Sequence, residues 1–165
     1  MKDYIIRKAN IDDKCAIARI YVNSWKFAYK GIVPQGYLDS LSVEKYMERL
    51  KDQTELDEFL LVLNGDVIGL AKIIDCRDKD LCSGAEIQTI YFLPDFIGRG
   101  YGNLLLKWMI EYAGSIGYKN IVVWVLTENK RARKAYERVG FQKDKVKLVT
   151  IGGKELRETR YSLCL

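Results

Sequence analysis

The chain has 165 residues, of which 48% are hydrophobic and 30% charged, with a net charge of +5 and no histidine. These values fit a single globular domain over residues 1–165, and no apolar run approaches the roughly 20 residues that a membrane-spanning helix needs. The absence of histidine excludes Ser-His-Asp and Cys-His catalysis, so acid–base chemistry must come from carboxylates, Tyr, Lys or Cys. The start of the chain lacks the long apolar segment of a signal peptide, which predicts a cytoplasmic protein.

The four cysteines show neither C-x-x-C nor zinc-ligand spacing, and we predict no metal site. Cys15 falls in a helical pattern and is expected to be a small core residue. Cys76 and Cys82 flank a polar loop and could approach each other, but the cytoplasm favours reduced thiols. The basic residues are densest at 130–138 without a nucleic-acid-binding motif, so we expect no nucleic-acid partner. The same bias suits a polyanionic cofactor.

Hydrophobic periodicity and turn residues divide the first half of the chain into short elements. Asn10, with an acid three residues later, predicts the start of a helix, and Asn64-Gly65-Asp66 predicts a hairpin turn. In chain order we expect a strand at 4–8, a helix from 10 to 22, a loop or irregular helix at 25–34, helices at 34–41 and 43–51, strands at 59–63 and 67–75, and a polar connection at 77–83.

The second half of the chain alternates strands with helices. We expect a strand at 86–92, a glycine loop, a helix at 103–113, a strand at 121–126, a helix at 129–139, and a hairpin of residues 141–149 and 156–163. The strand at 121–126 is nearly all apolar, which predicts that both of its faces are covered. This order of elements predicts one α+β domain with a mixed sheet flanked by helices.

Three glycines, Gly98, Gly100 and Gly102, alternate between the strand at 86–92 and the helix at 103–113. This order lets backbone N–H groups converge on an anion at a helix N-terminus. The spacing is not G-x-G-x-x-G, and no Gly-Lys-Ser/Thr follows, so neither a Rossmann dinucleotide nor a P-loop nucleotide is predicted. A plain tight turn is the alternative, but the alternation favours a site for a diphosphate.

Several segments together resemble the GNAT superfamily of N-acetyltransferases. The segment at 97–102 resembles the cofactor motif Q/R-x-x-G-x-G/A of that family, and here it reads Ile97-Gly-Arg-Gly-Tyr-Gly102. The segment at 129–141 is similar to its second signature, and here it reads Asn129-x-x-Ala132-x-x-x-Tyr136-x-x-x-Gly140-Phe141. Ile97 departs from the usual Gln or Arg, which removes a side-chain contribution but leaves the main-chain amides. The resemblance implies an α+β, three-layer fold with a mostly antiparallel central sheet of about seven strands.

The resemblance also implies acetyl-CoA as the cofactor, with direct attack of an amine on its thioester. The implied cofactor-binding residues are Tyr91, Phe92, Leu93, Ile97, Gly98, Arg99, Gly100, Tyr101, Gly102, Asn103, Asn129, Ala132 and Tyr136. The amides of the glycine loop would hold the diphosphate. Asn129 would contact the cofactor backbone, with helix capping as the alternative. A backbone N–H near Phe92, at a strand bulge common in this family, would meet the thioester oxygen.

Two residues are candidates for proton transfer. Glu86 lies six residues before Phe92, the spacing at which histone-acetylating relatives place a catalytic glutamate. Strand alternation predicts that Glu86 shares one face with positions 88, 90 and 92, so that its carboxylate can act as the base; an exposed or ion-paired glutamate is the alternative. Tyr136 is the candidate acid for the leaving thiolate, because a phenol keeps its proton at neutral pH. Anchoring of the helix to the sheet is the alternative for Tyr136.

The acceptor pocket is expected to form from the first helix, the loop after it and the late hairpin. Trp25, Phe27 and Tyr29, together with Glu86, are the predicted acceptor-binding residues. Three aromatic residues within five positions can clamp a ligand or contact a cation, although each could instead belong to the core.

The function predicted is that of an acetyl-CoA-dependent N-acetyltransferase that acts on a primary amine of a small molecule or a peptide. A protein N-terminal acetyltransferase of the ribosomal type and a catalytically silent, CoA-binding regulatory module are the alternatives. The expected partner is the amine or peptide acceptor, without a membrane, and a homodimer is compatible with the family resemblance.

Overall fold

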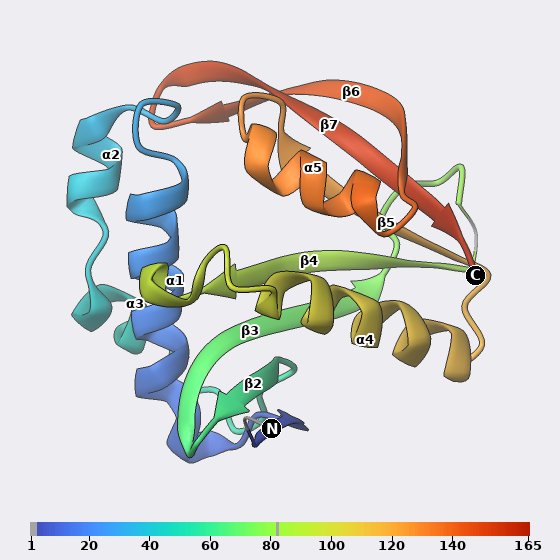
Figure 1. Ribbon diagram of the computed structural model, residues 1–165. Helices are drawn as coiled ribbons and strands as arrows, with labels where there is room; N and C mark the ends of the chain where they lie inside the picture. Colours follow the sequence, from blue (N-terminus) through green and yellow to red (C-terminus); the bar gives the residue numbers. More distant parts are fainter. Residues whose placement is uncertain (1–2, 82) are drawn as a thin grey trace.

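The computed structural model describes residues 3–81 and 83–165 (Figure 1). The strands are β1 (Tyr4–Lys8), β2 (Phe59–Leu63), β3 (Asp66–Asp75), β4 (Gly84–Phe92), β5 (Asn120–Leu126), β6 (Gln142–Ile151) and β7 (Lys154–Cys164). The helices are α1 (Lys14–Ala28), α2 (Gln35–Ser40), α3 (Val43–Leu50), α4 (Tyr101–Ser115) and α5 (Lys130–Arg138), with short 3-10 turns at Ile11–Asp13 and Pro94–Phe96. No helix within the described residues is both long enough and apolar enough to cross a bilayer.

The strands form one sheet in the order β1-β2-β3-β4-β5-β7-β6. Every neighbouring pair is antiparallel except β4 and β5, which are parallel. The predicted α+β fold, with a mixed and mostly antiparallel sheet of seven strands flanked by helices, is therefore confirmed.

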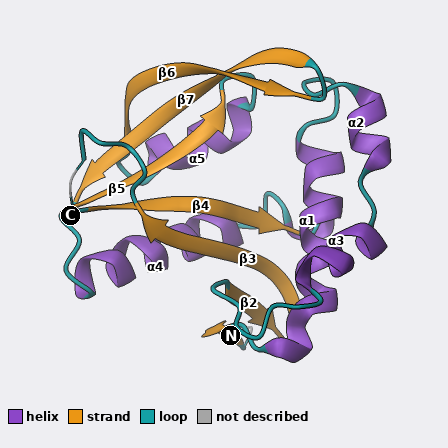
Figure 2. Cartoon of the chain, turned by 180° about the vertical axis from the view of Figure 1, so that it is seen from behind, coloured by secondary structure: helices purple, strands orange, loops and turns teal. Residues whose placement is uncertain are grey.

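Helices cover both faces of this sheet, which makes three layers (Figures 1 and 2). On one face Leu105 and Met109 of α4 pack in a cluster with Leu61. On the other face Ile17 of α1 packs in a second cluster with Leu60. Leu60 and Leu61 are neighbours in β2, so strand alternation sends one side chain into each core. Burial on both faces explains the continuous apolar sequence of this strand.

Two features of the chain differ from the prediction. Helix α1 continues to Ala28, through Trp25 and Phe27, whereas the sequence predicted an end at Val22 and a loop or irregular helix at 25–34. Polar residues at 23 and 24 interrupt the apolar pattern, but the small Ser24 is buried in the folded chain and the helix continues. Cys15 is exposed on α1, so its predicted core position was wrong.

Two further thiols, those of Cys76 and Cys164, are free. Cys82 lies outside the described residues, and the expected approach of Cys76 to Cys82 therefore stays a prediction.

Strand β4 contains a bulge at Gln88. Its neighbours Thr89 and Ile87 pair with Lys72 and Ile73, which are consecutive in β3, so Gln88 is an extra residue. The extra residue reverses the alternation of β4. The prediction that Glu86 shares a face with positions 88, 90 and 92 was therefore wrong, and the bulge lies four residues before its expected place near position 92.

The reversal assigns each part of β4 to a definite face. Glu86 now shares its face with Thr89 and Tyr91, the side that α1 covers. In agreement, the Tyr21 hydroxyl of α1 donates to Thr89 Oγ1 over 3.3 Å, and Tyr91 packs against the core cluster of α1.

Strands β4 and β5 diverge just beyond this bulge. Within the described chain they pair only over residues 84–87 and 120–123. Farther along, β4 stays with β3 and β5 stays with β7, so the two central strands separate (Figures 1 and 2). The opening between them forms the candidate site.

Candidate active site

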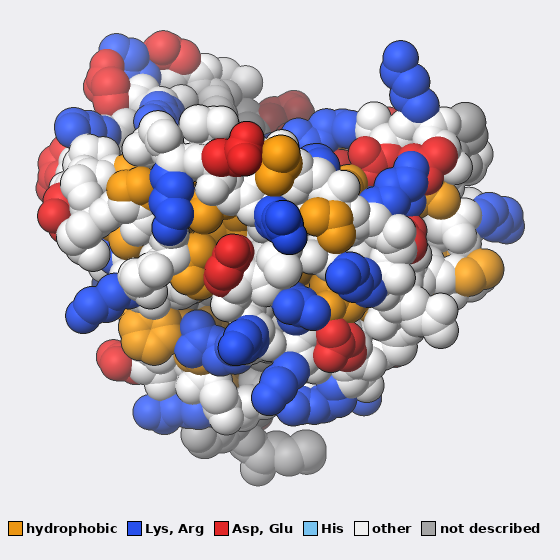
Figure 3. Space-filling view, turned by 90° about the horizontal axis from the view of Figure 1, so that it is seen from above, with side chains coloured by type: hydrophobic (Ala, Val, Ile, Leu, Met, Phe, Trp, Pro, Cys, Tyr) orange, Lys and Arg blue, Asp and Glu red, His pale blue; other side chains and the backbone are white. Residues whose placement is uncertain are grey.

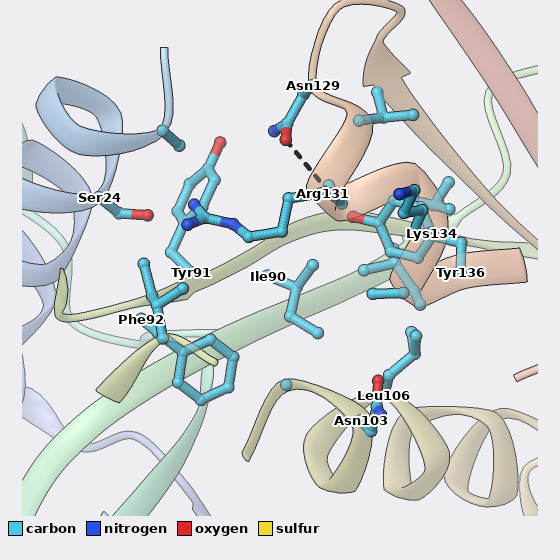
Figure 4. Close-up of a pocket in the computed structure, with 18 of the residues that line it drawn as sticks. Ser24, Ile90, Tyr91, Phe92, Asn103, Leu106, Asn129, Arg131, Lys134 and Tyr136 are labelled. Atoms are coloured by element: carbon cyan, nitrogen blue, oxygen red, sulfur yellow. Dashed lines mark hydrogen bonds between the residues drawn. The ribbon is translucent and has the colours of Figure 1, made fainter. Parts of the chain in front are cut away.

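A cavity of about 660 Å³ lies between the diverging strands. Residues 87–92 of β4 and 123–125 of β5 form its sides, and the glycine loop with the first turn of α4 borders it. Asn129 and residues 130–132, 134–136 and 138 of helix α5 line its remaining side (Figure 4). This volume lies within the range of ligand and cofactor sites.

The glycine loop turns through left-handed backbone conformations at the edge of this cavity. Gly98 has φ +81° and Gly100 has φ +92°, both in the region that glycine adopts without strain. Gly100 is the N-cap of α4, where no side chain caps the helix, and the first N–H groups of a helix have no intrahelical acceptor. Gly98, Gly100, Gly102 and Asn103 all line the cavity. The loop therefore offers free main-chain donors to an anion.

Helix α5 adds positive charge beside these donors. Lys130, Arg131, Lys134 and Arg138 line the same cavity. In Figure 4 Arg131 extends from α5 toward Tyr91, and Lys134 lies beside Tyr136. Lys and Arg side chains also gather on the face of the molecule seen in Figure 3. A cavity with main-chain donors at one end and four cations along one helix fits the diphosphate of coenzyme A.

Tyr136 lies in the wall of the cavity. Its side chain is 6% exposed, and its ring extends from α5 toward the space above Ile90 (Figure 4). Burial raises the pKa of Tyr136 above its usual value, and the nearby Tyr91 phenol raises it further by a smaller amount. The phenol therefore stays protonated at neutral pH and can donate a proton or a hydrogen bond into the cavity.

Asn129 caps α5 and also lines the cavity. Its Oδ1 accepts a hydrogen bond of 3.2 Å from the Ala132 N–H (Figure 4). The capping alternative is therefore observed, and the proposed contact of Asn129 with a cofactor would use the side-chain amide nitrogen.

Phe92 forms part of the cavity floor and depends on Gly69 in β3. A Cβ built on Gly69 would lie 2.4 Å from the Phe92 ring, so only glycine allows the ring this position. Gly69 was not among the residues predicted for the site. A glycine inside a strand is a signal for such a close approach.

We expect Gly69→Ala to lower the free energy of unfolding by about 1–3 kcal/mol, because the ring or the strand must move to admit a methyl group. Urea unfolding measures the change. The matched control is Gly36→Ala in α2, where an added Cβ would meet no described atom within 4 Å. That variant should be neutral or slightly stabilised, because alanine favours a helix. Equal stability of the two variants would contradict the role of Gly69.

A second, smaller cavity of about 210 Å³ adjoins the first. It lies between α1, β4 and β5 on one side and the β6–β7 hairpin on the other. The residues that line both cavities are Tyr29, Ile87, Gln88, Tyr91 and Trp124. The two spaces therefore meet at the gap between β4 and β5.

Glu86 faces this second cavity and is 2% exposed. Arg77 holds it with a two-pronged ion pair, in which Nε donates to Oε2 over 3.1 Å and Nη2 donates to Oε1. The hydrogen bond to Glu86 raises the pKa of Arg77. The ion-paired alternative for Glu86 is thus observed, and its neighbour Ile87 is one of the residues that line both cavities.

Aromatic side chains form another wall of the second cavity. Trp25 Nε1 donates to the Tyr91 hydroxyl over 3.1 Å, and the rings of Trp25 and Tyr29 meet edge to face at 4.6 Å. Burial raises the pKa of both Tyr29 and Tyr91. Phe27 lines neither cavity; its ring is 47% exposed, with the Arg131 guanidinium 5.0 Å from its centre. The structure therefore brings Trp25, Tyr29 and Glu86 together and leaves Phe27 outside.

Most of the expected cofactor-binding residues line the first cavity. Those that do so are Tyr91, Phe92, Ile97, Gly98, Gly100, Gly102, Asn103, Asn129, Ala132 and Tyr136. Three others do not line it. The Leu93 N–H bonds to the Ile68 carbonyl at 3.0 Å, Arg99 is exposed, and Tyr101 is buried against Phe96.

Several cavity residues were not identified from the sequence. In the second cavity they include Arg77, Trp124, Lys147 and Glu158. They come from four separate segments of the chain and have no common motif. Arg131 and Lys134 fall in the basic cluster noted above, which was the available signal.

Comparison with known proteins agrees with this geometry. The model of the acetyltransferase (GNAT) family matches residues 17–141. An uncharacterized N-acetyltransferase of Methanocaldococcus jannaschii is 32% identical over 149 residues, which cover 88% of this chain and 64% of that protein. A spermidine N(1)-acetyltransferase of Thermoplasma acidophilum is 26% identical over 145 residues, covering 83% and 87% of the two chains.

The crystal structure of the PaiA N-acetyltransferase from Thermoplasma acidophilum, in complex with coenzyme A, has a TM-score of 0.71. It is 21% identical and covers 94% of this chain and 98% of its own. The family match, together with the two adjoining cavities, identifies an acyltransferase that uses acetyl-CoA. The chain belongs to the acetyltransferase (GNAT) family.

The glycine loop provides a direct test of cofactor binding. We expect Gly100→Ala to weaken coenzyme A binding about tenfold, because alanine at φ +92° is strained by roughly 1–2 kcal/mol and the loop must shift. Calorimetric titration measures the affinity. Gly65→Ala is the matched control, since φ is +90° there but Gly65 lines neither cavity. It should lose similar stability and bind coenzyme A normally; equal affinity of both variants would contradict the assignment.

Proposed function

We propose that this protein transfers the acetyl group of acetyl-CoA to the primary amine of a small molecule. The observation that carries this proposal is the junction of the two cavities between β4 and β5. Tyr136 stands in the cavity that fits the cofactor, and Glu86 stands in the smaller one. When bound, acetyl-CoA supplies an acetyl group activated as a thioester. An amine in the smaller cavity would approach that group through the junction.

The proposed roles follow from the positions of the side chains. Glu86 takes a proton from the acceptor ammonium, directly or through a water, since its carboxylate lies at the edge of the smaller cavity. Tyr136 gives its proton to the departing sulfur, because burial keeps the phenol protonated. Beyond Ile87 the side of β4 that faces β5 is unpaired within the described chain. Its backbone N–H groups are placed to polarise the thioester oxygen.

The size and closure of the smaller cavity support a small acceptor rather than a peptide. The β6–β7 hairpin reaches over to α2 (Figure 1), where a Cβ on Gly152 would lie 2.7 Å from the Cβ of Tyr37. Lys154 Nζ also donates to the Ile32 carbonyl over 3.0 Å. These contacts hold the hairpin against the α1–α2 segment, so that a space of about 210 Å³ remains.

An assay of thiol release from acetyl-CoA, run with a panel of small amines and with peptides of free N-terminus, tests this proposal. We expect release with one or more small amines and none above background with peptides. Faster release with peptides would favour the protein N-terminal acetyltransferase. Coenzyme A binding without release from any acceptor would favour a silent regulatory module.

We expect Glu86→Gln to lower kcat/KM about 10²-fold at neutral pH, because the acceptor ammonium loses its base. The loss should shrink as the pH rises toward about 10, where a growing fraction of a primary amine is already free. Arg77 is 62% exposed and stays hydrated, so the variant should fold. A pH profile of kcat/KM for both proteins is the measurement. A deficit that is constant with pH would contradict the role of base.

A further inference from the structure

The smaller cavity contains two cations as well as two carboxylates. Arg77 pairs with Glu86, and Lys147 Nζ lies 3.5 Å from Glu158 Oε2. Lys147 Nζ also lies 3.9 Å from the centre of the Trp124 ring, in a cation–π contact. The charges of the cavity therefore balance before an acceptor enters.

Arg77 and Lys147 each have hydrogen-bond donors that the two carboxylates do not use. Arg77 uses Nε and Nη2 on Glu86, whereas Nη1 donates to none of the residues that the structure describes. The Lys147 ammonium is an ion-pair partner of Glu158, but it donates no hydrogen bond within the described chain. An ammonium has three donors and a guanidinium five. Free donors on two separate cations are suited to an anionic group of a ligand.

The same arrangement disfavours an acceptor with several positive charges. Each carboxylate of the cavity already has a cationic partner, so a second ammonium would find no unpaired anion and would be repelled by Arg77 and Lys147. An acceptor with one amine and one carboxylate keeps the balance. Its amine can turn toward Glu86 and its carboxylate toward the free donors.

We propose that the acceptor is a small amine that also carries a carboxylate, as in a free amino acid, and that Lys147 and Arg77 recognise this carboxylate. This inference rests on the proposed acetyl transfer and adds the substrate class. The cavity of about 210 Å³, walled by the Trp25 and Trp124 rings, has room for a molecule of that size. Lys147, on β6, is then a specificity residue, because it would contact the acceptor carboxylate and takes no part in the proposed proton transfers.

The experiment compares amino acids with the amines that result from removing only their carboxylate: lysine with cadaverine, arginine with agmatine, and tyrosine with tyramine. Initial rates of thiol release give kcat/KM for each member of a pair. We expect at least one pair in which the amino acid is preferred at least tenfold. In Lys147→Gln that ratio should fall about tenfold through KM, and Lys147→Arg should restore most of it.

The matched control is Lys143→Gln, which removes the same charge from the same strand at an exposed position outside the cavity. Its preference ratio should equal that of the parent protein. Decarboxylated amines that react as fast as the amino acids, or an equal ratio in Lys147→Gln and Lys143→Gln, would overturn this inference while acetyl transfer stands. Absence of thiol release from every acceptor would instead overturn the proposed function and this inference with it.

Discussion

Tyr136→Phe should lower kcat about 10³-fold with little change in KM. The substitution removes one hydroxyl from a ring that is 6% exposed in the wall of the cofactor cavity. General acid catalysis of this kind contributes on the order of 10²–10⁴ in rate. The ring remains in place, so binding is preserved and only the proton donor is lost.

The pH dependence sharpens this expectation. Burial raises the pKa of Tyr136, so its phenol stays protonated beyond the usual value of about 10. Activity of the parent protein should therefore not decline near pH 10 through this group. A decline centred at or below that pH and absent from Tyr136→Phe would contradict the buried, protonated phenol.

Tyr112→Phe is the matched control for this substitution. Tyr112 lies on α4, stacked on Trp108, and it lines neither cavity. It loses the same hydroxyl and should keep the parent rate. If Tyr136→Phe were as active as Tyr112→Phe, the assignment of Tyr136 as the acid would fail, and its ring would only anchor α5 to the sheet.

Arg160→Met should lower the free energy of unfolding by about 3 kcal/mol, the lower end of the range for breaking a buried ion pair. Arg160 of β7 is 2% exposed and pairs with Asp78 and Asp80 of the β3–β4 connection and with Asp144 of β6. The variant leaves three carboxylates close together. They are 25–42% exposed and can regain water, which limits the loss.

The loss should depend on pH. Hydrogen bonds from Arg160 and then Lys145 lower the pKa of Asp80. Burial acts to raise the pKa of Asp144, but hydrogen bonds from Arg160 and Ser162 outweigh it, and this pKa is also lowered. Carboxyls with a lowered folded-state pKa stabilise the protein above their unfolded pKa of about 3.9, and this stability is lost as the pH falls through the folded value.

Urea unfolding of parent and variant between pH 7 and pH 3 measures this dependence. The gap between the two should narrow as the pH falls toward 3, because the carboxyls bind protons in the unfolded parent chain before they do so in the folded cluster, and because protonation relieves the repulsion among the three carboxylates in the variant. Arg49→Met is the control for charge alone, since Arg49 is exposed on α3. A gap that stays constant with pH would show that Arg160 acts through packing only.

This cluster also reaches the acceptor cavity. Asp78 Oδ2 accepts from Trp124 Nε1 at 2.9 Å and from Arg160 Nη1 at 2.9 Å. Arg160 therefore holds, through Asp78, the Trp124 ring against which the Lys147 ammonium packs. A residue pattern in the sequence would not reveal this connection, because Asp78 lies 46 residues from Trp124 and 82 residues from Arg160.

Elements with local signals were the ones that the sequence predicted well. The Asn129 side chain accepts a hydrogen bond from the N–H three residues later, and Gly65 in the predicted hairpin turn has the positive φ that glycine adopts readily. These features depend on a few adjacent residues. The extent of α1 was missed, because the burial of the polar Ser24 is decided by the tertiary structure and interrupts the apolar periodicity that marks a helix.

The sequence by itself determined the order of elements, the glycine loop before α4 and the position of Tyr136 on a helix near it, since each follows from local backbone preference or helical spacing. Only the tertiary structure decided which face Glu86 occupies and where β4 separates from β5. The pairing of consecutive β3 residues with Ile87 and Thr89 places the extra residue at Gln88. The charges of the smaller cavity were decided in the same way, because distant strands bring Arg77, Lys147 and Glu158 together only when the sheet forms.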